Sequence, residues 1–122
     1  EKGLDPRNMI MCTDDCHSGT LLNDGHMNRV VRHAIDCGCD PLIALQMATI
    51  NTATHFGLER EIGSLAPGRR ADVILTSDLK TLPIETVIAR GQVVAHQVVQ
   101  LARDPDARGD TRIFLQQGLR GA

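Results

Sequence analysis

An apolar run that ends in two adjacent carboxylates is the feature that most constrains this chain. The run covers residues 9–13, and Asp14 and Asp15 follow it directly. An apolar run of this length is typical of a buried strand. Neighbouring carboxylates repel each other unless a cation or a hydrogen-bond network holds them, so they do not suit a core. Because active sites of parallel α/β folds lie at the carboxyl ends of strands, we expect residues 9–13 to be a strand that delivers both acids to a site.

Two helices are predicted after this acidic pair. Residues 14–25 are polar and contain glycine, which predicts a loop. Apolar residues recur at helical spacing over residues 26–37 and again over residues 41–56. The second helix has a clear start at Asp40 and Pro41, because aspartate caps helix N-termini and proline suits the first helical position.

Polar residues lie within the second predicted helix. Thr49, Asn51 and Thr52 are poor helix formers, and a helix that contains them usually relies on tertiary packing. We expect these side chains to bond to the backbone or to pack against the rest of the fold, rather than to take part in chemistry.

After residue 60 the pattern changes to short apolar runs between turns. Residues 71–75 read as a strand. Residues 87–89 and 93–95 flank a segment that begins with Arg90 and Gly91, which predicts a β-hairpin.

Three segments follow from these patterns. Residues 1–58 are predicted to hold a strand, a loop and helices, residues 59–100 short antiparallel strands, and residues 101–122 a weakly ordered tail. A buried parallel strand needs neighbours on both sides, and nothing before residue 9 supplies them. We therefore expect the chain to be a fragment of a larger protein.

Composition excludes several classes of function. The net charge is -2, and the only large aromatic residues are two phenylalanines, so neither an electrostatic footprint nor a stacking platform for nucleic acid is present. The charge equally gives no attraction to an acidic membrane, and no stretch approaches the length of a membrane-spanning helix. Four cysteines follow no common zinc spacing, and we expect them to be free thiols of a cytoplasmic protein.

Four motifs stand in a fixed order along the chain. They are Thr13–Asp15, Leu21–His26, Ala48–Ala53 and Gly63–Val73. This order resembles the C-terminal part of the adenine deaminase family within the amidohydrolase superfamily, over about residues 8–100. The last motif is shared across the superfamily, whereas the combination of the first three is more specific.

The resemblance implies a fold of the α/β class. Residues 9–13 correspond to the last strand of a metal-dependent-hydrolase (β/α)8 barrel, and residues 26–37 and 41–56 to the helices after it. Residues 62–99 correspond to part of a small β-sandwich built from both ends of the full-length chain.

The resemblance also implies a chemistry and a set of site residues. Members of the family hydrolyse adenine to hypoxanthine and ammonia at a binuclear metal centre, with manganese or iron as the expected metal and zinc as an alternative. Asp14 matches a metal ligand and proton acceptor, whereas Asp15 and His17 match substrate contacts and His26 is a further candidate. The implied partners are the small molecule adenine and further copies of the full-length protein.

Other interpretations of the same residues stay open. Asp14 and Asp15 also suit an ordinary loop or a helix cap, and His17 and His26 suit a polar surface. The paired histidines of the family's first strand and those of its fifth and sixth strands have no counterpart in this sequence, so we expect this chain alone to be inactive. The alternatives are an amidohydrolase for another cyclic amidine or amide, and a non-catalytic truncated or decayed fragment.

Overall fold

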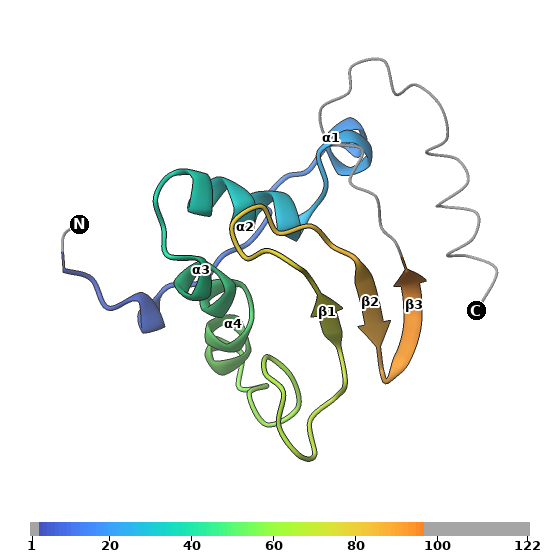
Figure 1. Cartoon of the computed structure of the whole chain (residues 1–122). Coiled ribbons are helices and arrows are strands. Elements are labelled where there is room, and N and C mark those ends of the chain that lie inside the picture. Colours follow the sequence, from blue (N-terminus) through green and yellow to red (C-terminus); the bar gives the residue numbers. More distant parts are fainter. Residues whose placement is uncertain (1–2, 97–122) are drawn as a thin grey trace.

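Helices form the first half of the chain and a small sheet forms the second (Figure 1). The computed structural model describes residues 3–96, so the predicted tail at 101–122 lies outside the described residues. The elements in order are the 3-10 helix η1 (Pro6–Asn8), the helices α1 (Ser18–Asn23), α2 (Met27–Asp36), α3 (Pro41–Ala48) and α4 (Ile50–His55), and the strands β1 (Val73–Leu75), β2 (Thr86–Ala89) and β3 (Gln92–His96).

The segment at 9–13 is not a strand of any sheet within residues 3–96, which differs from the strand predicted there. Its backbone is extended at Met9, with φ -110° and ψ 139°. Its hydrogen bonds go to η1, α3 and α4; the Met11 N–H, for example, donates to the Met47 carbonyl at 3.1 Å. The physical reason is that a strand requires the hydrogen-bond ladder of a neighbour, and β1, β2 and β3 pair only with one another.

Helix α1 lies inside the region predicted as a loop, which corrects that prediction. Its sequence starts with serine and glycine and ends with asparagine, all poor helix formers, so propensity gave no signal. The helix is closed at its C-terminal end by Thr20, whose carbonyl accepts from the N–H groups of Asp24 at 2.9 Å and Gly25 at 3.1 Å.

Helix α2 confirms the prediction over residues 26–37. It ends in a Schellman motif, in which Gly38 has φ 94° and donates to Ile35, while the Cys39 N–H donates to the Ala34 carbonyl. The side chain of Val31 on this helix is buried in the core.

The helix predicted over 41–56 is in fact two helices, α3 and α4, separated at Thr49. The predicted start is confirmed, because the Asp40 carboxylate accepts from the N–H of Leu42 at 2.9 Å. Thr49 has φ -128° and ψ -92°, and its hydroxyl donates to the Leu45 carbonyl at 2.6 Å. In a continuous helix the Thr49 N–H would donate to this Leu45 carbonyl; here it donates to the Gln46 carbonyl at 3.2 Å instead, so the helical pattern is interrupted at Thr49.

The three strands form one antiparallel sheet in the order β1-β2-β3. The predicted hairpin is confirmed, and its two-residue turn has φ 52° at Arg90 and φ 78° at Gly91, as a type I′ turn requires. The strand predicted over 71–75 is confirmed at Val73–Leu75. Just before this strand, the Asp72 carboxylate accepts from the Arg90 N–H at 2.8 Å and so ties the hairpin turn to β1.

The core joins the helices to the sheet. Its buried side chains are Val31, Ala44, Leu82 and Ile84, which come from α2, α3 and the segment before β2. Around this small cluster many large apolar side chains stay exposed; Leu65 is 75% exposed, and Val93 on the edge strand β3 is 63% exposed.

Gly63 is expected to be essential for packing against α4. It has φ 93°, and a Cβ there would lie 2.7 Å from the Ala53 Cβ and 3.0 Å from the Ile50 Cα. Gly63→Ala should combine backbone strain of about 1–2 kcal/mol with overpacking of about 1–3 kcal/mol. Equilibrium unfolding in urea measures the loss.

Gly68→Ala is the matched control for this prediction. Gly68 has φ 81°, but a Cβ there meets nothing within 4 Å, so only the backbone strain remains. Equal destabilisation by the two substitutions would contradict the proposed contact between residue 63 and α4.

Candidate functional site

We call residues 9–13 the extended segment. It is followed by Asp14, whose backbone lies in the left-handed region with φ 51°. Aspartate is one of the few residues other than glycine that visits this region readily. The chain turns here, and the side chains of Asp14 and Asp15 are both exposed. The predicted acids therefore stand on a surface turn between the extended segment and α1.

His17 occupies the N-cap position of α1. It has φ -66° and ψ 149°, its side chain makes no capping hydrogen bond, and it is exposed. Asp14, Asp15 and His17 thus lie together on one turn, although no hydrogen bond or ion pair within the described residues joins their side chains. We call Asp14–His17 the acidic turn.

His26 stands apart, at the N-cap of α2. Its side chain makes no capping hydrogen bond, and its backbone N–H donates to the Asn28 side-chain oxygen at 2.9 Å. His26 is exposed, as the interpretation of it as a surface residue expects.

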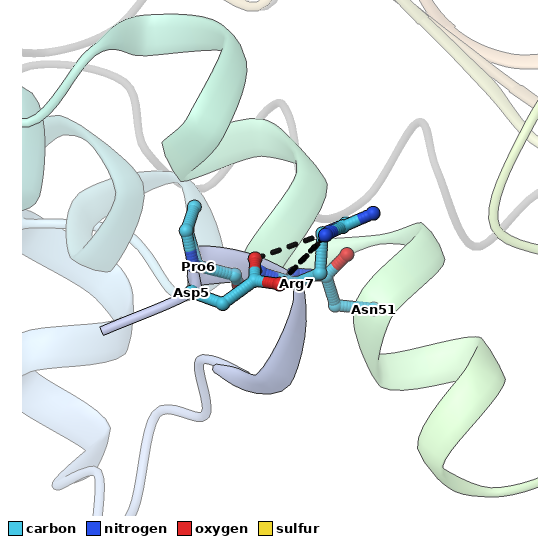
Figure 2. Close-up of polar contacts among 4 residues, drawn as sticks. All are labelled: Asp5, Pro6, Arg7 and Asn51. Carbon is cyan, nitrogen blue, oxygen red and sulfur yellow. Dashed lines mark hydrogen bonds and ion pairs between the residues drawn. The ribbon is translucent and has the colours of Figure 1, made fainter. Parts of the chain in front are cut away.

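Helix α4 holds the segment that leads to the acidic turn. The side-chain amide of Asn51 donates to the Pro6 carbonyl at 2.8 Å and to the Met9 carbonyl at 3.0 Å, and Figure 2 shows Asn51 projecting from α4 beside η1. On the same helix the Thr52 hydroxyl donates to the Met47 carbonyl at 2.9 Å. The expectation that Asn51 and Thr52 bond to the backbone is confirmed, but the sequence did not reveal that Asn51 reaches a distant segment.

Asp5 and Arg7 close the tight turn of η1 (Figure 2). Arg7 donates from Nη2 to the Asp5 carboxylate at 2.8 Å and from its backbone N–H at 3.0 Å. The side-chain hydrogen bond from Arg7, followed by the backbone one, holds the pKa of Asp5 below its ordinary value of 3.8. The pair is exposed, so it shapes a local turn and is not part of a buried centre.

The described residues do not by themselves fit a metal centre. Among residues 3–96, no three His, Cys, Asp or Glu side chains converge closely enough to hold an ion. All four cysteines are free, and the contact between the Cys37 Sγ and the His33 Nε2, at 3.8 Å, joins only two possible ligands. Asp14 is therefore not part of a group of three such side chains within residues 3–96. In the same described range, no helix is both long and apolar enough to cross a bilayer.

Comparisons with known proteins give a consistent family. The model of the amidohydrolase family matches residues 2–94. An adenine deaminase of Roseobacter denitrificans is 92% identical over 95 residues, which are 78% of this chain and 16% of that protein. An adenine deaminase of Paracoccus denitrificans is 82% identical over 127 residues, which cover 100% of this chain and 21% of that protein.

A solved structure is also similar. It is that of an amidohydrolase from Thermotoga maritima, 31% identical, with a TM-score of 0.48 over 58% of this chain and 19% of that one. This chain spans about a sixth to a fifth of the length of the two adenine deaminases that it matches. The sequence similarities agree with the resemblance found in the four motifs.

The pKa of Asp5 provides a test of the η1 turn. Arg7→Met removes the side-chain donor and should raise the pKa of Asp5 toward 3.8, measured by NMR titration of its carboxyl carbon. Because the folded-state pKa is lowered, the stabilisation is present above pH 3.8 and is lost as the pH falls through the folded-state pKa. Lys80→Met, which removes a cation from another loop, should leave the pKa of Asp5 unchanged; an equal rise would contradict the assignment to Arg7.

The isolated 122-residue chain should not retain a stoichiometric metal ion. A carboxylate with no second protein ligand does not hold a divalent cation through gel filtration, because such sites need several converging donors. Elemental analysis of the purified chain after incubation with Mn²⁺ and after incubation with Zn²⁺ measures this. One retained equivalent of either ion, lost in the Asp14→Asn chain, would show that the chain contains a complete site.

Proposed function

This chain belongs to the amidohydrolase family, and we propose that it is the segment of an adenine deaminase that carries one acidic wall of the active site. The observation that supports the proposal is the exposed Asp14 at φ 51°, at the end of a segment that α3 and α4 anchor. Aspartate accepts this backbone conformation readily, and the turn leaves the carboxylate exposed at the end of the anchored segment. The high identity to adenine deaminases gives the reaction class.

The finer architecture is part of the proposal. In the full-length protein, residues 9–13 would be the last strand of a (β/α)8 barrel, with strand neighbours from the rest of the protein. The extended backbone at Met9 supports this role, as does the absence of a strand partner for this segment among residues 3–96. The sheet β1-β2-β3 would be part of the β-sandwich, since its edge strands and exposed Val93 leave a surface for further strands.

The reaction replaces an amine by an oxygen. The C6–N bond of adenine breaks, a C6–O bond to the oxygen of water forms, and the products are hypoxanthine and ammonia. The Asp14 carboxylate would take a proton from the attacking water and deliver it to the departing amine, which is general acid–base catalysis. The divalent metal that the family implies lowers the pKa of water when bound, and its identity as manganese or iron, with zinc as the alternative, is proposed from the resemblance.

Two neighbours of Asp14 would contact the substrate. The Asp15 carboxylate can only accept hydrogen bonds when ionised, which suits the N–H groups of a purine, and His17 can donate or accept. Both side chains are exposed on the acidic turn and make no hydrogen bond with the other residues of 3–96. We further propose a cytoplasmic location, supported by free cysteines, and a homo-oligomeric full-length protein, supported by the resemblance alone.

A chimera tests the activity. The matching 21% of the Paracoccus denitrificans relative is replaced by this chain, and the release of ammonia and hypoxanthine from adenine is measured. The chimera should deaminate adenine, and Asp14→Asn in it should lower kcat by about 10²–10⁴-fold, the usual contribution of an acid–base group. Asparagine also accepts a positive φ, so unfolding of the chimera should be unchanged.

Asp36→Asn is the matched control, since it removes an exposed carboxylate at the end of α2 and should leave kcat within about twofold. An Asp14→Asn chimera that keeps its activity would contradict the role of Asp14. A folded chimera that hydrolyses a cyclic amide but not adenine would favour the alternative substrate class. A folded chimera inactive on both would favour the non-catalytic fragment.

A further inference from the structure

The Asp14 carboxylate makes no hydrogen bond and no ion pair with any of residues 3–96, so its position depends on the backbone that carries it. Hydrogen bonds with α3 and α4 hold the segment that leads to Asp14. We propose that Asn51 is a positioning residue for Asp14: it fixes the extended segment and thereby aims the acidic turn. The catalytic part of this inference rests on the proposed function, whereas the structural part does not.

The orientation of the Asn51 amide is determined by its partners. Both acceptors, the carbonyls of Pro6 and Met9, lack protons, so only the NH₂ group of Asn51 can face them. The two distances, 2.8 Å and 3.0 Å, match ordinary N–H···O bonds. Asn51 is half-buried and thus uses both of its donors on one segment that is remote in sequence.

The break between α3 and α4 provides a third attachment. In an uninterrupted helix a carbonyl accepts from the N–H four residues later. Thr49 interrupts this pattern, and the Met47 carbonyl accepts from the Met11 N–H at 3.1 Å and from the Thr52 hydroxyl at 2.9 Å. The extended segment is therefore attached at Met9 and Met11, and η1 just before it is attached at Pro6.

The last attachment lies three residues before Asp14. Three extended residues span at most about 10 Å, so a small tilt at Met9 or Met11 becomes a displacement of the carboxylate. Displacements of about 1 Å in a catalytic group can cost about 10²-fold in rate. Asn51 would therefore influence the rate by orienting a functional side chain, without touching the substrate itself.

The structural part is tested on the 122-residue chain by NMR amide exchange. Asn51→Leu keeps a similar size but removes both donors, and the Met11 N–H should then exchange about tenfold faster or more, as local opening becomes easier. Thr54→Val is the control, because the Thr54 hydroxyl bonds only within α4, to the Ile50 carbonyl at 2.8 Å. It should leave Met11 exchange unchanged.

The catalytic part is tested in the chimera. Asn51→Leu should lower kcat by about 10–100-fold, the usual effect of removing a residue that orients a functional side chain. Asn51→Gln, which retains an NH₂ donor, should recover part of that loss, whereas a purely structural loss of packing would not be restored by a longer polar side chain. If the leucine variant does not fold, Asn51→Ser, with one donor, should give intermediate values of both exchange and kcat.

Three outcomes would overturn the inference. They are an unchanged Met11 exchange rate in Asn51→Leu, a Thr54→Val chimera that loses as much activity as Asn51→Leu, and an active chimera whose kcat is insensitive to residue 51. An unmodified chimera without adenine deaminase activity would instead contradict the proposed function, and the exchange rates would still decide whether Asn51 holds the segment.

Discussion

A backbone amide outside helices and sheets must find an acceptor elsewhere, and Met11 finds one at the end of α3. The helix stops at Thr49, and the Met47 carbonyl just before the break accepts from the Met11 N–H and from the Thr52 hydroxyl. The interruption divides the helical region into α3 and α4, and the extended segment bonds to the end of α3 beside this break. The acidic turn lies at the far end of that segment, so its geometry depends on an irregularity in a helix more than thirty residues later.

The small core works with this arrangement. Ala44 of α3 is fully buried beside Val31 of α2 and Leu82 of the segment before β2. Met11 packs against the same cluster, so the extended segment contacts both the hydrogen bonds of the helix junction and the apolar interior. Such a residue couples the acidic turn to the fold as a whole, rather than to one loop.

Local signals in the sequence predicted much of this fold, and non-local contacts account for the errors. Asp40 with Pro41, and Arg90 with Gly91, act on their own neighbours, so their effects could be read directly. Whether residues 9–13 form a strand depends on which strands lie beside them, and the residues next to them in sequence do not determine that.

The candidate site divides in the same way. Asp14, Asp15 and His17 are close in space because they are close in sequence, which made the acidic turn predictable. The partners of Asn51 are 45 and 42 residues away, and a polar residue on a helix does not reveal whether it faces water or a distant carbonyl. A metal site of three or more His, Cys, Asp or Glu side chains, which residues 3–96 do not form, would likewise depend on contacts that no single stretch of sequence encodes.

The six residues of α4 face different partners on successive positions. Ile50 and Ala53 lie against Gly63, where even a methyl group does not fit, and Asn51 is committed to the extended segment. Substitutions in this helix are therefore restricted both by the contact with Gly63 and by the hydrogen bonds of Asn51. In a library of natural or random variants, neutral substitutions should concentrate at its exposed end, Thr54 and His55, and changes at the other positions should survive mainly as coordinated pairs.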